Sequence, residues 1–334
     1  MSRDAGSAVS LAVVGLGYWG PNIARIVDVL PGVELRWCLD TDPQRRTRLE
    51  QAFRTTRFTD SLDELLADEM LDGVMIATPV PTHAELAVRV LEAGKHCFVE
   101  KPLAQSLADA ELAVAAAERA GRVLMVGHLL EYHPGVRRLA EVVAAGELGE
   151  VRYIYTNRLN LGKLRADENA LWSLGAHDVS VVLALAGEEP SELDARGESY
   201  MRAGIEDVVF AYLRFPSGIT AHLHLSWLDP HKERRLTVVG SKRMATFDDM
   251  ELERKLTIYD KGFDESADTW GEYIARSGDV TSPRIPNAEP LRLECEHFVE
   301  CVRTGATPRS DGRSGLRVVR VLAELQAALE RTRR

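Results

Sequence analysis

Hydrophobic residues form two alternating patterns along the first part of the chain. Short apolar runs are typical of buried strands, and apolar residues that recur at helical spacing are typical of amphipathic helices. The runs predict strands at 11–15, 33–40, 73–77, 96–100 and 123–127. The helical segments, several opened by Ser or closed by Gly, lie at 22–30, 61–67, 83–93 and 106–120. Strands that alternate with helices predict an α/β domain with a doubly wound parallel sheet.

The pattern changes after a helix predicted at 135–145. Strand-like runs then follow one another at 151–159, 192–200, 208–215, 219–227, 235–239, 244–248 and 255–259, with one clear helix at 176–186. Consecutive strands joined by short turns indicate a mostly antiparallel sheet, so we expect the second domain to be α+β.

The last part of the chain completes the domain plan. Residues 261–290 are rich in Gly, Asp, Ser and Pro and show only weak periodicity, which predicts a long surface loop with local order at most. Helices are predicted at 293–303 and 315–332. We therefore expect a first domain at 1–149, a second at 150–290, and helices at 291–334 that pack back on the first domain.

Composition narrows the classes of partner. The chain has 334 residues, of which 45% are hydrophobic and 28% charged, and its net charge is −10, which argues against binding to nucleic acid or an anionic membrane. The four cysteines form no C-x-x-C pair, so we expect reduced thiols and no metal centre. The first ten residues are polar and no long apolar stretch occurs, which predicts a cytoplasmic protein with a small-molecule substrate.

A glycine-rich turn follows the first predicted strand. The sequence G-L-G-Y-W-G places Gly15, Gly17 and Gly20 where a dinucleotide-binding loop needs a tight turn, a close approach of the backbone to pyrophosphate, and close packing of helix on sheet. The amide groups of the following helix would bind the phosphates. A glycine turn without a ligand is the plain alternative.

An acidic residue follows the second predicted strand. Asp40 lies twenty residues after Gly20 and would accept hydrogen bonds from the ribose hydroxyls, which favours NAD over NADP. Arg45 and Arg46 are the counter-evidence, because an arginine here could bind a 2′-phosphate. The third strand ends at Thr78 and Pro79, on the edge where such sheets bind ligands, so both are candidate cofactor contacts; His83 either touches the cofactor or starts a helix.

Two further segments carry candidate chemistry. The strand 96–100 ends in Glu100-Lys101-Pro102, and a lysine beside a nicotinamide would have its pKa lowered towards neutrality, so that it could exchange a proton with an alcohol. An exposed lysine beside a turn is the alternative. His177 begins the helix 176–186 and suits proton transfer near neutral pH, although it could equally be a helix-start histidine. We reject metal binding by the pairs His222/His224 and His128/His133, which lack a carboxylate at metal-site spacing.

Taken together, these segments resemble the glucose-fructose oxidoreductase, inositol dehydrogenase and rhizopine-catabolism (Gfo/Idh/MocA) superfamily. The resemblance covers nearly the whole chain and rests on V-V-G-L-G-Y-W-G, I-A-T-P-V-P-T-H-A-E-L-A, V-E-K-P-L-A, V-G-H and G-A-H-D. It implies a Rossmann domain, a C-terminal domain with an open sheet that often mediates homodimers or homotetramers, and NAD(P)-dependent oxidation or reduction of a sugar-type secondary alcohol.

The resemblance also implies roles for individual residues. Lys101 would contact the reacting hydroxyl and the nicotinamide ribose, and His177 would act with it in proton transfer. Ser173 stands where the family pattern D-x-G-x-H has aspartate, so the usual Lys–Asp–His arrangement is incomplete. The candidate cofactor contacts are Gly15, Gly17, Tyr18, Trp19, Gly20, Asp40, Thr78, Pro79, His83, Glu100, Lys101 and Pro102. The candidate substrate contacts are His128, Arg158, Asn160, Arg165, Trp172, Ser173 and His177.

Within the family, the segments Y-T-N-R-L-N-L-G, N-A-L-W and S-W-L-D-P-H-K are similar to the branch that oxidises the 3-hydroxyl of nucleotide-linked amino sugars or sugar acids. The acidic balance also suits a cationic aminoglycoside, so we expect an amino-sugar dehydrogenase of an antibiotic or amino-sugar pathway whose keto product suits a pyridoxal-phosphate aminotransferase. The alternatives are an NADP-dependent 3-keto-sugar reductase and a non-catalytic NAD-binding regulator on the same fold.

Overall fold

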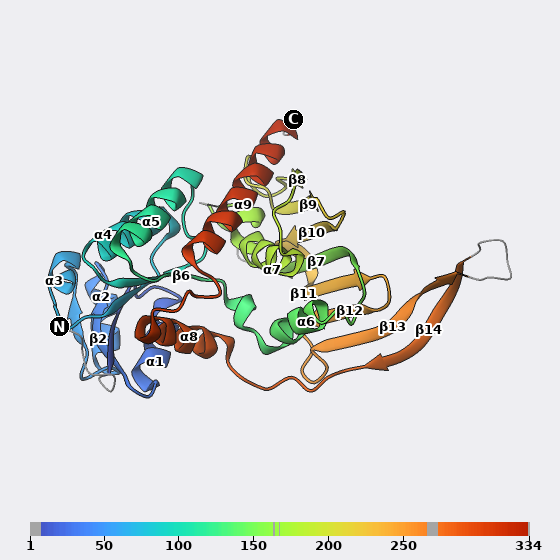
Figure 1. Cartoon of the computed structure of the whole chain (residues 1–334). Helices are drawn as coiled ribbons and strands as arrows, with labels where there is room; N and C mark the ends of the chain where they lie inside the picture. Colours follow the sequence, from blue (N-terminus) through green and yellow to red (C-terminus); the bar gives the residue numbers. More distant parts are fainter. Residues whose placement is uncertain (1–7, 163, 167, 266–272, 333–334) are drawn as a thin grey trace. The chain divides into compact units, whose positions relative to one another are not determined.

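The computed structural model describes residues 8–162, 164–166, 168–265 and 273–332. The chain forms two compact units, Met1–Tyr132 with Glu289–Arg320, and His133–Ala288 with Val321–Arg334 (Figure 1). The domain boundaries expected at 149 and 290 stay predictions, and the polar N-terminal segment 1–7 lies outside the described residues.

The first unit is built on a six-stranded sheet in the order β3-β2-β1-β4-β5-β6, and every neighbouring pair is parallel. This order confirms the doubly wound parallel sheet. The central strands are almost completely buried, as expected for a sheet covered on both faces. The strands are β1 (Val9–Val14), β2 (Val33–Leu39), β3 (Arg57–Thr59), β4 (Gly73–Ile76), β5 (His96–Glu100) and β6 (Leu124–Gly127).

Helices α4 and α5 pack against each other, and α1 packs against α8 (Figure 1). The predicted helix starts are confirmed where serine caps them: Ser106 accepts a hydrogen bond from the amide of Asp109 at 3.1 Å. Gly121 ends α5 in the left-handed conformation, with φ of 59°. The helices of this unit are α1 (Gly20–Val29), α2 (Pro43–Glu50), α3 (Leu62–Leu66), η1 (Val80–Thr82), α4 (His83–Glu92), α5 (Leu107–Ala120), η2 (Leu129–Tyr132) and α8 (Pro290–Thr304).

The second unit contains an eight-stranded sheet in the order β14-β13-β12-β11-β7-β10-β9-β8. All of its neighbouring pairs are antiparallel except β7 with β10, which confirms a mostly antiparallel sheet. Its strands are β7 (Val151–Leu161), β8 (Glu192–Glu198), β9 (Val208–Arg214), β10 (Thr220–Ser226), β11 (Leu228–Gly240), β12 (Met244–Asp248), β13 (Leu256–Glu265) and β14 (Tyr273–Thr281). Helices α6 (Pro134–Ala144) and α7 (Ala176–Ala186) pack together, and α9 (Gly312–Thr332) contributes its last residues.

The predicted loop at 261–290 is wrong for residues 261–265 and 273–281, which form strands. Strand β13 continues to Glu265 and pairs with β14, so that the two form a ribbon that extends beyond the rest of the sheet (Figure 1). Both faces of the ribbon are largely exposed, so its sequence lacks the alternation that marks a half-buried strand. Residues 266–272 of the predicted loop lie outside the described residues.

Candidate active site

The glycine turn lies at the carboxyl edge of the parallel sheet, between β1 and α1. Gly15 has φ of +92°, and a side chain there would place its Cβ 2.7 Å from the carbonyl oxygen of Ala77. At Gly20 a Cβ would lie 1.8 Å from the carbonyl oxygen of Gly15. Both positions therefore require glycine because the backbone of the turn packs against β4 and against itself.

Gly17 differs from its two neighbours in the motif. Among the described residues, a Cβ at this position would meet only the Arg45 Nη1, at 3.7 Å, so their packing does not require glycine here. Because Gly17 has no side chain, a ligand can approach its backbone closely beside the start of α1. This is the arrangement that a dinucleotide pyrophosphate needs, and the residues present fit that group.

Asp40 connects the glycine turn to the end of β2. Its side chain is buried, and its Oδ2 accepts a hydrogen bond from the amide of Leu16 at 2.6 Å, while its Oδ1 accepts from the amide of Asp42 at 2.9 Å. Arg45 Nη1 lies 3.4 Å from the same Oδ2. Arg46 pairs with Asp60 at 3.2 Å. The carboxylate is thus held in place, with a half-exposed guanidinium beside it.

His83 links two loops at this edge. It is completely buried at the start of α4, and its ring nitrogens lie 2.8 Å from the carbonyl oxygens of Pro102 and Thr78. Burial and the nearby charge of Lys101 lower the pKa of His83, so the imidazole is neutral and donates to one of these carbonyls. The side chain therefore holds together the loops that follow β4 and β5.

Thr78 and Pro79 continue this loop. The hydroxyl groups of Thr78 and Thr82 form a hydrogen bond of 2.7 Å, and the amide of Thr82 donates to the carbonyl of Pro79 at 3.0 Å. A Cβ at Gly15 would lie 2.8 Å from Thr78 Cγ2. The loop is therefore packed directly against the glycine turn.

Glu100 and Lys101 end β5 at the same edge. The amide of Lys101 donates to Glu100 Oε2 at 3.3 Å, and the Lys101–Pro102 peptide bond is cis. Burial raises the pKa of Glu100 to about 7, against the opposing effects of the Lys101 charge and of a hydrogen bond from the Trp19 indole. The glycine turn therefore contacts Glu100 through Trp19, whose ring also stacks on the exposed ring of Tyr18.

His128 follows β6 and is completely buried. Neither of its ring nitrogens has a hydrogen-bond partner among the described residues. Burial and the charge of Lys101 lower the pKa of His128 to about 3, which keeps the ring neutral. The first unit therefore brings all of its predicted cofactor residues, together with His128, to the carboxyl edge of one sheet.

The predicted residues of the second unit lie on β7 and at the start of α7. A π-helical turn, Leu171–Gly175, precedes α7, and it contains Trp172 and Ser173, both half-buried. Asn169 holds this turn, because its side-chain oxygen accepts from the amide of Trp172 at 3.2 Å. His177 follows in the first turn of α7. A π turn is often found at functional sites.

Arg158 and Asp178 join β7 to α7. Both side chains are buried, with Arg158 Nε to Asp178 Oδ2 at 2.7 Å and Nη2 to Oδ1 at 3.1 Å. Asn160 lies two residues further along β7, and its Oδ1 is buried without a hydrogen-bond partner among the described residues. Arg165 is half-exposed and pairs with Glu168 at 2.9 Å. Among these predicted substrate contacts, Arg158 therefore already uses two of its nitrogens to bind Asp178.

Sequence reasoning missed two features, one in each unit. The π turn has no recognisable signal in L-W-S-L-G, and Glu294 looked like an ordinary polar position of a helix. Among the described residues, no group of three or more His, Cys, Asp and Glu side chains is arranged to hold a metal ion. No helix in the described part of the chain is long and apolar enough to cross a bilayer.

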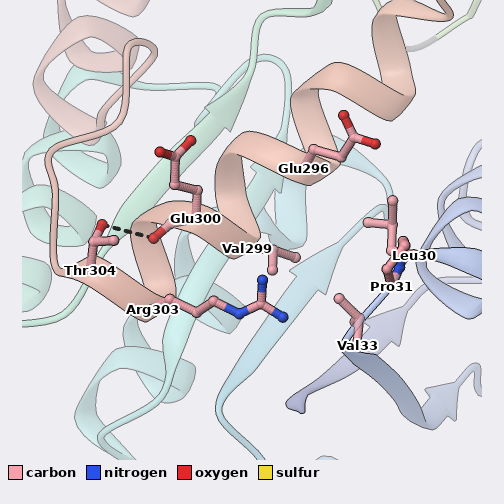
Figure 2. Close-up of a pocket in the computed structure, with 8 residues that line it drawn as sticks. All are labelled: Leu30, Pro31, Val33, Glu296, Val299, Glu300, Arg303 and Thr304. Atoms are coloured by element: carbon pink, nitrogen blue, oxygen red, sulfur yellow. Dashed lines mark hydrogen bonds between the residues drawn. The ribbon is translucent and has the colours of Figure 1, made fainter. Parts of the chain in front are cut away.

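A shallow pocket lies away from the glycine turn, at the amino edge of the same sheet. Figure 2 shows Leu30 and Val33, where α1 leads into β2, facing residues of α8 such as Val299. Arg303 closes one side and donates a hydrogen bond to the carbonyl of Gly32 at 2.6 Å. None of the candidate site residues lines this pocket.

Known proteins share this architecture. Residues 9–128 match the model of the GFO/IDH/MocA oxidoreductase family with an NAD-binding Rossmann fold, and residues 136–246 match the GFO/IDH/MocA C-terminal domain. UDP-N-acetylglucosamine 3-dehydrogenase of Acidithiobacillus ferrooxidans is 28% identical over 319 residues, which cover 95% of this chain and 96% of that protein. A solved structure of that enzyme aligns with a TM-score of 0.82 over 97% of this chain and 98% of its own.

Two other relatives show the breadth of the similarity. GenD2 from gentamicin A biosynthesis, solved in complex with NAD, is 26% identical and has a TM-score of 0.82, with 100% of this chain and 97% of that chain covered. The 2,7-anhydro-N-acetylneuraminate hydratase of Escherichia coli is 27% identical over 264 residues, or 75% of this chain and 70% of that protein. With both of its family models matched, the chain belongs to the GFO/IDH/MocA family of oxidoreductases and carries an NAD-binding Rossmann domain.

Proposed function

We propose that this protein is an NAD-dependent dehydrogenase that oxidises a secondary alcohol, at C3, of an amino sugar. The observation that carries the proposal is the position of Lys101 at the carboxyl end of β5, on the edge that also holds the glycine turn and Asp40. In open α/β sheets the cofactor binds outside this edge. A lysine here can reach the reacting end of a dinucleotide.

The chain's own residues would bind the cofactor, orient the sugar and take the proton from its hydroxyl group. Gly17 and the start of α1 would hold the pyrophosphate, and Asp40 would hold the adenosine ribose. When bound, NAD supplies the acceptor for the hydride that leaves the sugar carbon. Lys101 and His177 would take the proton from the hydroxyl group, so that the alcohol becomes a ketone.

Ser173 cannot supply the carboxylate of the family pattern D-x-G-x-H. The general-base role therefore falls on Lys101 and His177, and we assign Arg158 an indirect part, since it holds Asp178 beside His177. The remaining substrate contacts would come from His128, Asn160, Arg165 and Trp172.

The substrate class is inferred from charge and from relatives. The net charge of −10 would attract a cationic amino sugar. One relative is named for a UDP-linked amino sugar and another comes from gentamicin A biosynthesis. We therefore propose a nucleotide-linked amino sugar or an aminoglycoside, in a biosynthetic route where a pyridoxal-phosphate aminotransferase would consume the keto product. The buried free thiols, among them Cys38 and Cys97, support a cytoplasmic location.

The test is NADH formation with NAD and a panel of UDP- and TDP-linked amino sugars, their uronic acids and aminoglycosides, run beside Lys101→Ala. Turnover of one class by the wild type and loss in the variant would support the proposal. Reduction of 3-keto sugars with NADPH, without oxidation of any alcohol, would favour the reductase. NAD binding by calorimetry without turnover in either direction would favour the non-catalytic regulator.

We also propose that the protein is a homo-oligomer that associates through the open face of its eight-stranded sheet. Tyr155, His222 and Tyr212 are in register across β7, β10 and β9 on this face, and the rings of Tyr155 and His222 stack at 5.2 Å. Phe210 is 53% exposed and stacks on His224 at 4.4 Å. Aromatic side chains are typical of the centre of protein interfaces.

The face continues onto the β13–β14 ribbon. Tyr259 pairs with Met244 in the next row along the same face, and Phe263 and Tyr273 follow on the same side, 62% and 66% exposed. A two-stranded ribbon is marginally stable alone. The eight strands have about nine residues on average and give a face of roughly 1,100 Å². This exceeds the ~800 Å² that each partner contributes to a stable interface. A second copy of this chain fits that area and would also cover the ribbon.

A further inference from the structure

Glu294 is a buried carboxyl group that the proposed mechanism does not use. It lies in α8, its side chain has no solvent exposure, and neither carboxyl oxygen has a hydrogen-bond partner among the described residues. An ionised carboxylate in such a place would lose its hydration without any compensating donor, at a cost of many kcal/mol. The side chain must therefore be neutral, or lie against a group that shares a proton with it.

The packing of α8 on β5 brings Glu294 towards Glu100. Phe298 lies one helical turn after Glu294 and packs edge-on against Phe98, with 5.9 Å between ring centroids. Glu100 lies two residues after Phe98, on the same side of β5. Its carboxylate folds over Gly127 of β6, where a Cβ would lie 3.1 Å from Glu100 Oε2 and 3.0 Å from Phe98 Cζ.

The groups that face Glu294 come from three elements. Glu100 stands at the end of β5, Glu131 and Tyr132 lie in η2, and Cys295 is the neighbour in α8. Burial, together with the charges of Glu100 and Glu131, raises the pKa of Glu294 well above its usual value. Among the described residues, no arginine or lysine forms an ion pair with Glu294. Arg309 donates a hydrogen bond to the carbonyl oxygen of Glu131 at 3.1 Å, and the charge of Lys101 acts on Glu100.

Glu100 has one carboxyl oxygen that can accept a hydrogen bond from Glu294. Its Oε2 accepts from the Lys101 amide, whereas its Oε1 is buried and has no hydrogen-bond partner among the described residues. Two carboxyl groups that face each other in a dry site cannot both ionise, so one keeps its proton and donates it to the other. Since Lys101 favours the charged form of Glu100, the proton belongs on Glu294.

We propose that Glu294 is a positioning residue: it stays protonated and donates a hydrogen bond to Glu100, and the pair holds a single proton and a single negative charge behind Lys101. The shared proton is a property of the substrate-free protein and does not depend on the proposed function. Only its effect on turnover rests on that function. The pair would fix the Glu100 carboxylate, and through it the backbone and charge environment of Lys101.

The direct test is infrared spectroscopy of the substrate-free protein with isotope-labelled glutamate. At neutral pH the wild type should show the carbonyl band of a protonated carboxyl group, and Glu294→Gln should lose it. Glu300→Gln, an exposed change on the same helix, should keep it. A spectrum of Glu294→Gln identical to that of the wild type would overturn the proposal.

The acceptor of the proton can be identified in the same way. Glu100→Gln should shift the Glu294 band, because it replaces the charged acceptor by a neutral one, whereas Glu131→Gln should leave the band unshifted. A shift in Glu131→Gln alone would mean that η2, and not β5, receives the proton, and would overturn the pairing.

Turnover tests the positioning role. With a substrate in hand, Glu294→Gln should keep kcat within about twofold, because its amide still donates, whereas Glu294→Leu should lower kcat roughly tenfold, the loss expected for a hydrogen bond to a charged group. Equal loss in both variants, or none in Glu294→Leu, would overturn this role. A failure to find any substrate would leave the infrared result intact, so the two proposals fail separately.

Discussion

Arg158 binds Asp178 through two hydrogen bonds, 2.7 Å and 3.1 Å long, that join β7 to the start of α7. Both side chains are buried, and Asp178 directly follows His177 in α7. A fork of this kind fixes direction as well as distance, because two guanidinium nitrogens and both carboxylate oxygens are used. It therefore sets where the first turn of α7 begins.

Removing one partner of this pair should destabilise the protein strongly. In Arg158→Ala the buried Asp178 carboxylate loses its charge partner, and the free energy of unfolding should fall by about 3–5 kcal/mol. Denaturation in urea measures it. The double variant Arg158→Met with Asp178→Leu should recover most of the loss. Equal stability of the single and double variants would contradict a role as a buried ion pair.

Lys101→Ala should abolish turnover and leave cofactor binding nearly unchanged. Loss of a positioned general base or acid lowers kcat by about 10²–10⁴-fold, whereas the pyrophosphate and ribose contacts of the glycine turn and Asp40 remain. Stopped-flow turnover and NAD calorimetry measure the two effects. Full activity in this variant would remove Lys101 from the mechanism.

Asp40→Ser should shift the cofactor preference from NAD towards NADP. The change removes a carboxylate that would bind the ribose hydroxyls and repel a 2′-phosphate, and it releases Arg45, which lies 3.4 Å from it. We expect NAD affinity to fall by about 10–100-fold, the value of one or two charge-assisted hydrogen bonds. Adding Arg45→Ala should cancel any gain in NADP affinity, and calorimetry with both cofactors decides.

Stability should fall as the solution is acidified, in part through His96. Burial lowers the pKa of His96 to about 4, so below the unfolded-state value of about 6.5 the unfolded chain binds a proton that the folded protein rejects. The free energy of unfolding therefore falls between pH 6.5 and 4. His96→Asn, whose amide oxygen can still accept from the Val123 amide, should reduce this fall by roughly 1 kcal/mol.

The control for this pH dependence is the exposed His231. A His231→Asn variant should follow the wild-type profile of unfolding free energy against pH. A profile that is the same for His96→Asn and the wild type would show that His96 does not contribute.

The open sheet face can be tested on the ribbon itself. Phe263→Ser with Tyr273→Ser should raise the dissociation constant of the oligomer by at least tenfold, because both side chains would be buried by a second copy. Ile274→Ser changes an equally apolar residue on the opposite face of the same ribbon and should leave it unchanged. Sedimentation velocity separates the outcomes. A wild-type monomer at all concentrations would exclude the interface.

The local patterns of the sequence predicted most of the first unit. Strands such as β5 and helices such as α5 carry their signal in neighbouring residues, and the glycine turn carries its own. Helix α2 was missed because it has no buried residue and therefore no apolar stripe, although Asp42 caps it by accepting from the Gln44 amide at 2.8 Å. The ribbon was missed for the same reason, since it faces solvent on both sides.

The site was predictable to the extent that its residues are close in sequence. The glycine turn, Asp40 and Lys101 are each tied to the end of a strand, which fixes the edge where they lie. The contacts of Glu294 and Arg158 are not visible in this way, because their partners come from elements far along the chain. Only the packing of α8 on β5 and of β7 on α7 reveals them.

The ribbon also sets a gradient of local opening along one strand. In β13, Ile258 and Tyr259 pair with β12 on one side and β14 on the other, whereas residues from Lys261 onwards pair only with β14. Amide hydrogens should therefore exchange slowly at the base of the strand and quickly towards its end. Association of two copies would slow exchange only of the amide hydrogens from Lys261 onwards. Deuterium uptake along this one strand would therefore report assembly without any measurement of activity.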